Sequence, residues 1–412
     1  MSVYRALITG LMRSPAPGNL PRRAQAWDIF YHMRYVAHPD PTVELYTDMI
    51  RACAEANEPE TLRGFDLWTE MTVDKRLTPT SDAYNAIITL AARSKSSALD
   101  ATRLAMEMLE LGRDANGKPA LPLTTVTYVA LLEAAKRLGD LKQARWLLMK
   151  LARNGPNGTS AVNEWALRHV FHTYAMYSPP FKREFTNTVE TATTPHNKDE
   201  RGREEASHKH AEALTQDLTE NGQEGPQTTG YEALLPQTSR AVLAEADALF
   251  DLFVREKGVN QVGPSDELQQ PELFSGVVDV GVVAEAYLSA YLRHSPSVKN
   301  VIEKARGIHE QLNIEWSADM IRICMIHCAR RSTSSLPLVA EFAKELWHKW
   351  LEIIDQEKSY ISRWLPGGST TPAERRSIPR SSLKTSTIAT VWAAYIQIAA
   401  RCVGVDLCLG DY

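Results

Sequence analysis

Residues 81–88 have the sequence SDAYNAII, and this stretch decides the fold. Its aromatic residue, Tyr84, is followed three and four positions later by apolar residues, which is the spacing of one face of an α-helix. The same spacing begins at other aromatic residues, at intervals of about 40 residues: Tyr4, Tyr46, Tyr128 and, as a weaker copy, Trp165. A pattern that returns at such an interval predicts repeated structural units.

A second pattern follows each copy of the first. It consists of a small residue, two large apolar residues three and four positions later, and another large one at position seven, as in Ala26, Ile29, Phe30 and Met33. Further copies begin at Gly64, Ala101, Ala144, Ala246, Ala305 and Ala343. The small residue lets two helices approach closely, and the large pair fills the space between neighbouring units.

Together the two patterns predict helical hairpins of about 35 to 45 residues each. A single hairpin cannot bury its apolar faces alone, whereas stacked hairpins form a continuous core. We therefore predict an all-α fold, an α-α superhelical solenoid of about seven hairpins.

Composition divides the chain into five segments. Residues 1–177 are predicted to form an array of about four and a half repeats, and residues 237–357 to continue it in degenerate form. Residues 178–236, rich in Thr, Glu, Gln, Asn and Gly, fall between the two helices of the fifth repeat. They are predicted to be disordered, because they bury too little apolar area to offset chain entropy. Residues 358–384 are predicted to be a polar loop, and residues 385–412 a terminal helix with an irregular cap.

The charge balance limits the possible partners. The chain has 46 Lys and Arg residues against 50 Asp and Glu residues, a net charge of −4. Phosphate contacts need cations, but the acidic excess lies in residues 181–232, and residues 1–177 are slightly basic. No run of eighteen apolar residues occurs, so no membrane span is predicted.

The five cysteines do not have the spacing of a disulfide framework, and they predict a reducing compartment. Cys324 and Cys328, one helical turn apart, are expected to pack a helix face. We expect no metal and no cofactor.

Two stretches carry a resemblance to a known family. Residues 81–88 and 125–132, SDAYNAII and TVTYVALL, resemble the opening of the first helix of pentatricopeptide repeats, and residues 26–33, AWDIFYHM, resemble the second helix. The resemblance is strong over residues 1–155 and weaker over 238–355. Family members are mostly organellar RNA-binding proteins. The resemblance therefore implies a mitochondrial matrix protein that binds single-stranded RNA, either mRNA or rRNA, and supports transcript processing, stability or translation. No presequence is visible in this chain.

The resemblance also implies base-facing residues. In the family, the residue just after the aromatic one and the last residue of the repeat face one RNA base. The matching positions are Arg5, Thr47, Asn85, Val129 and Ala166 after the aromatic, and Thr42, Thr80, Thr124 and Ala161 at the end of the repeat. Asn85 and Thr47 can hydrogen-bond a base edge, whereas Val129 and Ala166 cannot. Threonine at the last position departs from the usual Asp or Asn of the family.

A basic residue often ends the first helix, where it can meet phosphate. The corresponding residues are Arg13, Arg93, Arg137, Arg293, Arg330 and Arg401, while the second repeat has Glu55. Lined along one wall, these arginines would form a positive stripe that the net charge hides. The alternative is that each is an ordinary cation favoured at a helix C-terminus by the helix dipole.

No catalytic constellation is present in the sequence. It lacks a phosphate-binding Gly-x-x-x-x-Gly-Lys-Ser/Thr loop, a His-Glu-x-x-His pair and a Gly-x-Ser-x-Gly elbow. We therefore predict no catalytic residues, no small-molecule substrate and no enzymatic activity. Five tryptophans of the second helices are expected to pack in the core rather than stack on bases: Trp27, Trp68, Trp146, Trp347 and Trp350.

Two functions remain open from the sequence. The first is RNA binding along the row of first helices. The second is a helical-repeat scaffold that binds protein, such as a small-subunit component of the mitochondrial ribosome. A continuous positive stripe would favour RNA, and a neutral or acidic surface would favour protein.

Overall fold

The computed structural model describes residues 2–13, 19–38, 40–56, 58–113, 119–153, 160–181, 235–259, 273–295, 297–330, 336–364 and 385–402. Across these ranges the regular structure is helical without a β-strand, apart from two isolated bridges, Asn163 with Gly276 and Phe181 with Thr238. The all-α prediction is confirmed. The chain divides into two compact units, Met1–Leu151 and Ala152–Tyr412, which are described separately.

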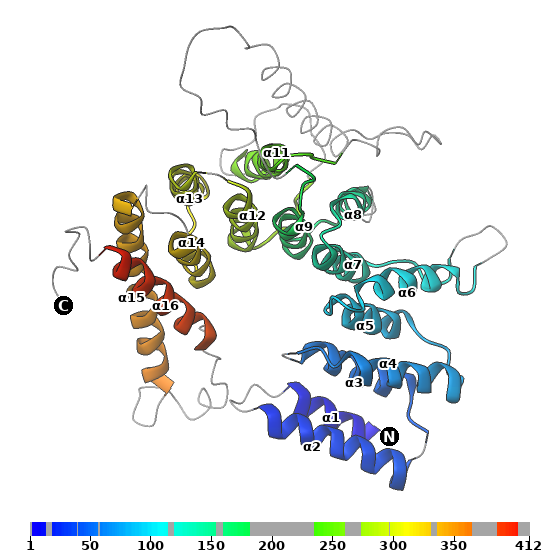
Figure 1. Ribbon diagram of the computed structural model, residues 1–412. Helices are drawn as coiled ribbons and strands as arrows, with labels where there is room; N and C mark the ends of the chain where they lie inside the picture. Colours follow the sequence, from blue (N-terminus) through cyan, green and yellow to red (C-terminus); the bar gives the residue numbers. More distant parts are fainter. Residues whose placement is uncertain are drawn as a thin grey trace, which may run out of the picture. The chain divides into compact units, whose positions relative to one another are not determined.

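Unit 1 is built of helix pairs (Figure 1). Its helices are α1 (Ser2–Arg13), α2 (Asn19–His32), α3 (Val43–Glu55), α4 (Thr61–Thr69), α5 (Ser81–Ala92), α6 (Ala98–Glu110), α7 (Thr125–Leu138) and α8 (Leu141–Arg153, whose last two residues belong to unit 2). α1 packs on α2, α3 on α4, and α5 on α6. The first helices also pack on one another in order, α3 on α5 and α5 on α7. Each hairpin therefore contributes its first helix to a common row.

Two second helices end in a wider turn that the sequence patterns do not predict. α2 continues into the π-helical turn η1 (Met33–Ala37), and α4 into η2 (Glu70–Asp74). A backbone hydrogen bond closes each turn. The amide of His38 donates to the carbonyl of Met33 at 2.6 Å, and the amide of Lys75 donates to the carbonyl of Glu70 at 2.9 Å. Each adds one residue per turn and so shifts the side chains beyond it.

The core of unit 1 follows the second sequence pattern. Ala26 and Gly64 are buried, and a Cβ at Gly64 would overlap the side chain of Leu90 on α5 and lie 3.5 Å from that of Cys53 on α3. The large residue four positions later packs on the tyrosine of the next hairpin: the rings of Phe30 and Tyr46 are 6.4 Å apart edge to face, and those of Trp68 and Tyr84 are 5.0 Å apart. One aromatic contact therefore joins each of these two hairpins to its successor.

Unit 2 uses the same contact. Its helices are α9 (Glu164–Met176), α11 (Ser239–Val259), α12 (Val280–His294), α13 (Val298–Leu312), α14 (Ala318–Arg330), α15 (Leu336–Trp364) and α16 (Thr385–Cys402). Phe250 of α11 stacks on Tyr287 of α12 at 3.9 Å between ring centroids, and Trp347 of α15 stacks on Tyr395 of α16 at 4.1 Å. Both Phe250 and Trp347 occupy the fourth position after the small residue.

The two ends of the predicted insertion lie together. The hydroxyl of Tyr177 donates to the carbonyl of Pro236 at 3.2 Å, and the amide of Phe181 donates to that of Gln237 at 3.1 Å. Residues 182–234, where disorder is predicted, lie outside the described residues. Both ends of the insertion belong to unit 2, because the two compact units divide after Leu151.

The C-terminal elements differ from prediction in one respect. α15 runs to Trp364, so residues 358–364, which the composition predicts as loop, are helical. The reason lies in the sequence: Ile354, Ile361 and Trp364 continue the helical spacing across the polar stretch between them. α16 matches the predicted terminal helix. Residues 365–384 and 403–412, the rest of the predicted loop and the cap, lie outside the described residues.

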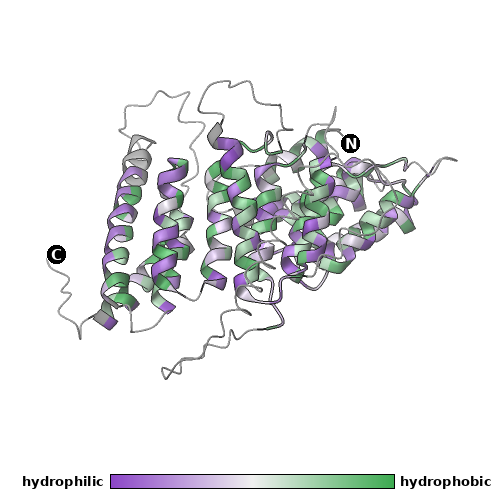
Figure 2. Cartoon of the chain, turned by 90° about the horizontal axis from the view of Figure 1, so that it is seen from above, coloured by the Kyte–Doolittle hydropathy of each residue, from purple (hydrophilic) through white to green (hydrophobic). Residues whose placement is uncertain are grey.

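Hydrophobic and hydrophilic residues occupy different faces of the helices (Figure 2). This is the distribution expected where one face of each helix packs against its neighbours. None of the described helices is both long and apolar enough to cross a membrane.

Candidate nucleic-acid interface

The three threonines at the ends of repeats begin the first helices of unit 1. Thr42, Thr80 and Thr124 are the N-cap residues of α3, α5 and α7, and all three are exposed. The hydroxyl of Thr80 accepts from the amide of Ala83 at 3.3 Å, and that of Thr124 from Thr127 at 3.4 Å. Threonine is favoured here because its oxygen satisfies an amide that has no partner within the helix. Thr42 occupies the same position without a side-chain cap hydrogen bond.

The third repeat brings its two predicted base-facing residues together. The amide nitrogen of Asn85 lies 3.4 Å from the hydroxyl of Thr124, and Thr127 donates to the Asn85 carbonyl oxygen at 2.6 Å. Asn85 is half-buried and Thr124 is exposed. An amide held by two hydroxyls is a preformed donor and acceptor pair, which is the chemistry that reads a base edge.

Thr47 does not fit the role predicted for it. Its side chain is buried, with 4% exposed, and its hydroxyl donates to the carbonyl of Val43 at 2.7 Å. A threonine hydroxyl is close enough to the backbone to bond within its own helix. The prediction that Thr47 faces a base is therefore wrong for this structure.

The two other predicted base-facing positions that follow an aromatic residue in unit 1 hold a charged residue, Arg5, and an apolar residue, Val129. The Nε of Arg5 lies 2.8 Å from a carboxylate oxygen of Asp48 on α3. This hydrogen bond raises the pKa of Arg5 above its usual value, and it pairs the guanidinium with a carboxylate. Val129 is half-buried. Only Asn85 therefore presents a polar group suited to reading a base at this position of unit 1.

The fifth repeat is shifted by two residues from the predicted alignment. Tyr46, Tyr84 and Tyr128 are buried, each four residues after the N-cap of its helix, whereas Trp165 is 47% exposed. In α9 the N-cap is Asn163, and the buried residue four positions on is Leu167. Leu167 thus takes the place of the tyrosine, because burial of the helix face, and not aromatic character, sets the alignment.

This shift replaces both predicted residues of the fifth repeat. Ala166 is buried, and neither it nor Ala161 occupies the position assigned to it. The corresponding residues are Asn163, which caps α9 by accepting from the amide of Ala166 at 2.9 Å, and Arg168. The guanidinium of Arg168 lies 5.5 Å from the ring centroid of Trp165. The N-cap preference for Asn was the sequence signal that could have found this pair.

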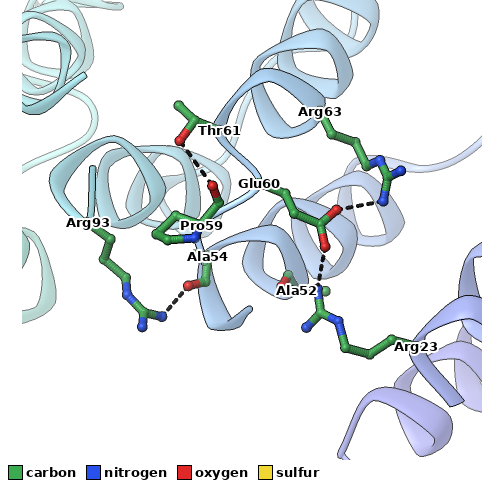
Figure 3. A network of polar contacts seen from close by, with 8 residues as sticks. All are labelled: Arg23, Ala52, Ala54, Pro59, Glu60, Thr61, Arg63 and Arg93. Atoms are coloured by element: carbon green, nitrogen blue, oxygen red, sulfur yellow. Dashed lines mark hydrogen bonds and ion pairs between the residues drawn. The ribbon is translucent and has the colours of Figure 1, made fainter. Parts of the chain in front are cut away.

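Two of the predicted phosphate-binding arginines cap a neighbouring helix. Arg93, at the end of α5, donates to the carbonyl of Ala54 in the last turn of α3 (Figure 3). Arg401, near the end of α16, donates in the same way to Ala329 in the last turn of α14. The last carbonyls of a helix lack partners within it and lie at the negative end of its dipole, so they attract a cation.

The other predicted cations are arranged differently. Arg137 pairs with Glu133 of its own helix at 3.4 Å. Arg293 and Arg330 are exposed. The side chain of Arg13 lies outside the described residues. The expected stripe of guanidinium groups is therefore partly committed to structural contacts: Arg93 and Arg401 to carbonyls, and Arg137 to a carboxylate.

The described residues do not assemble a metal centre: no group of three His, Cys, Asp or Glu side chains among them could hold a metal ion. Cys53, Cys324 and Cys328 are buried. Burial raises the pKa of the Cys53 and Cys328 thiols to about 12 in each case. A thiol with so high a pKa is a poor nucleophile and ligand at neutral pH.

The tryptophans of the second helices follow the core-packing prediction with one exception. Trp27, Trp68, Trp347 and Trp350 are buried, whereas Trp146 of α8 is 44% exposed. Trp146 lies two positions after the small residue Ala144, on the side opposite the core residues of α8.

No protein-family model matches this sequence, and no curated protein matches it.

Proposed function

We propose that this chain is a helical-repeat protein of the pentatricopeptide type that binds single-stranded RNA along the row of its first helices. RNA would lie across the N-terminal turns of these helices, with bases directed at the residues beside each N-cap. Binding would hold the strand extended, and so protect it or keep it unpaired for processing or translation. No covalent bond is made or broken.

The observation that carries this proposal is the contact between Asn85 and Thr124, 3.4 Å apart. They come from consecutive first helices and are the two positions at which the family reads a base. The row formed by α3, α5 and α7 supports the solenoid, since each first helix packs on the next. A mitochondrial location rests on the resemblance alone.

A second candidate, a scaffold that binds protein, is favoured by the committed charges. Arg5 is paired with Asp48, and Arg93 is bound to a carbonyl, so neither is available to phosphate without losing a contact. A component of the mitochondrial ribosome's small subunit would be one such scaffold.

Binding of the full chain to labelled mitochondrial transcripts and random single strands, over a series of salt concentrations, tests the proposal. If a handful of phosphates are contacted, the logarithm of affinity should fall with the logarithm of salt with a slope of roughly −2 to −4, at about 0.7 per contact. Asn85→Ala should weaken binding about fivefold, the effect of losing one hydrogen bond of ~1 kcal/mol. Asn300→Ala, at an exposed asparagine of α13, is the control and should leave affinity unchanged.

A folded, helical protein that binds no RNA at low salt would sink the proposal and favour the scaffold. Equal losses from Asn85→Ala and Asn300→Ala would show that the Asn85 and Thr124 pair does not contact RNA.

A further inference from the structure

α8 exposes an aromatic ring between two lysines along one line. Lys142, Trp146 and Lys150 follow one another at intervals of four residues and are all exposed, so they lie on one face of the helix, each about one 5.4 Å turn from the next. The core residues of α8, such as Ala144 and Leu148, lie on the opposite face. The helix contains no acidic residue. We call Lys142, Trp146 and Lys150 the α8 stripe.

The position of Lys150 distinguishes this hairpin from those before it. Six residues after the small residue of the second helix stand His32, Glu70 and Glu107 in the first three hairpins. Each contacts the hydroxyl of the tyrosine in its own hairpin, at 3.4, 2.7 and 2.8 Å. In the fourth hairpin this position is Lys150, whose ammonium lies 6.0 Å from the ring centroid of Trp146. The residue that contacts the tyrosine hydroxyl in the first three hairpins lies here beside an indole.

We propose that the α8 stripe is a second contact for single-stranded RNA, in which one base stacks on the indole of Trp146 and the flanking phosphates pair with Lys142 and Lys150. This inference rests on the proposed function, but it places RNA on a second helix, away from the N-caps of the first helices. An aromatic face between cations is the combination that binds single strands without regard to sequence. Every base has a ring face that can stack on the indole, and each lysine can pair with any phosphate. Neither contact depends on the RNA sequence.

Other polyanions match the α8 stripe less well. An anionic membrane would need a broad apolar face to insert, and this face of α8 carries one ring among cations. An acidic polypeptide would pair with the lysines but offers no regular partner for the indole. Single-stranded RNA uses both kinds of group.

The test is fluorescence anisotropy of the full chain with a labelled, unstructured RNA 20-mer of mixed sequence, over a salt series. Trp146→Ala should weaken binding about tenfold, within the range for one stacked base. Trp146→Phe should recover most of this loss, because it keeps an aromatic face. Lys142→Ala with Lys150→Ala should lower the magnitude of the salt slope by about 1.4, two contacts at 0.7 each.

The matched control is Lys344→Ala with Lys349→Ala on α15. These lysines are also exposed on one second helix, but glutamates surround them, and Lys349 pairs with Glu352 at 3.2 Å. The control changes the net charge equally, so a general electrostatic effect would appear in both pairs. We expect the control to leave the salt slope unchanged. Circular dichroism of each variant checks that the helices remain folded.

The outcomes separate this inference from the proposed function. If Asn85→Ala weakens binding and none of the α8 variants does, the α8 stripe is not an RNA contact. If only the α8 variants weaken binding, the α8 stripe is an RNA contact and the row of first helices is not. If the wild-type chain binds no RNA, both proposals are wrong. The same holds if the wild-type chain binds phosphatidylserine vesicles but not the RNA.

Discussion

The phenolic hydroxyl of Tyr46 donates a hydrogen bond to Glu70 at 2.7 Å, and one hairpin later Tyr84 donates to Glu107 at 2.8 Å. The two pairs occupy identical positions in their repeats, and each ties the first helix of a hairpin to its second. Glu70 also pairs with Arg34 of the preceding hairpin at 2.7 Å. One carboxylate therefore links two helices of its own hairpin to the hairpin before it.

Removing this hydroxyl should destabilise unit 1. Tyr46→Phe leaves the carboxylate of Glu70 without one donor and should lower the free energy of unfolding by about 1–2 kcal/mol. Urea denaturation followed by circular dichroism measures the loss. Tyr35→Phe, at a tyrosine that is largely exposed on η1, should change stability by less than about 0.5 kcal/mol. Equal effects of the two substitutions would contradict the role assigned to Tyr46.

The same pair predicts a loss of stability in alkali. Burial, together with the hydrogen bond to Glu70, raises the pKa of Tyr46 well above its usual value. The unfolded tyrosine loses its proton near pH 10, while the folded one keeps it, so the stabilisation is complete below about pH 10 and declines above it. Tyr46→Phe should make stability fall less steeply between about pH 10 and pH 11.

Arg93→Met should destabilise the protein by about 1–3 kcal/mol, because the carbonyl of Ala54 loses a charged donor. The methionine keeps most of the aliphatic packing. Arg103→Met on α6 is the control: this side chain is 82% exposed and pairs with Asp100 of its own helix, so the change should stay within about 0.5 kcal/mol. If Arg93→Met weakened RNA binding at unchanged stability, a phosphate contact would be the better account of Arg93.

Two glycines of unit 2 should respond in opposite directions to alanine. A Cβ at Gly276 would lie 2.6 Å from the backbone carbonyl oxygen of Val162, which cannot move aside freely. Gly276→Ala should therefore cost about 1–3 kcal/mol. Gly307, inside α13, has open space around it, so Gly307→Ala should stabilise by about 0.5–1 kcal/mol. Thermal melts of both variants measure the two effects, and a loss of stability in Gly307→Ala would contradict the open space around Gly307.

His294 predicts an acid-sensitive unit 2. Its ring is buried, and its Nε2 lies 2.8 Å from the carbonyl of Tyr174. Burial lowers its pKa below the usual value, and the charge of Arg293 acts in the same direction, although the carbonyl of Tyr174 opposes them. The unfolded histidine gains its proton near pH 6.5 before the folded one does, so stability is complete above about pH 6.5 and falls as the pH drops below it.

Replacing this histidine tests the assignment. His294→Gln keeps a donor for the Tyr174 carbonyl but cannot titrate. The stability difference between about pH 7.5 and pH 5.5 should be smaller in this variant than in the wild type, in urea denaturation at both pH values. An unchanged difference would assign the acid sensitivity to other groups.

Periodicity predicted the helices well because burial of one face imposes it on the sequence. The aromatic residues misled the alignment only where a different residue filled the same place, as Leu167 does two residues after Trp165. The N-cap, Asn163, was the better guide, since an unpaired amide requires a side-chain oxygen at that position.

The candidate site was less predictable, because hydrogen-bond partners come from distant parts of the chain. Nothing in the sequence next to Arg93 indicates that its guanidinium will bind the Ala54 carbonyl. Similarly, the position of Trp146 relative to Ala144 predicts an outward face, but its aromatic character suggested the core. Thr47 carries a hydroxyl that could bond a base edge, but it is buried. Its burial is decided by the packing of the whole unit.

The caps supplied by Arg93 and Arg401 bear on how the chain is made. The last turn of α3 gains its cap only when Arg93, 39 residues after Ala54, has been synthesised. The carbonyl of Ala329 gains its cap only when Arg401, 72 residues later, has been synthesised. Translation and folding are thus coupled in sequence, with each of these helices completed by a residue that the ribosome adds well after it. A nascent chain stalled before Arg93 would hold α3 with a frayed end.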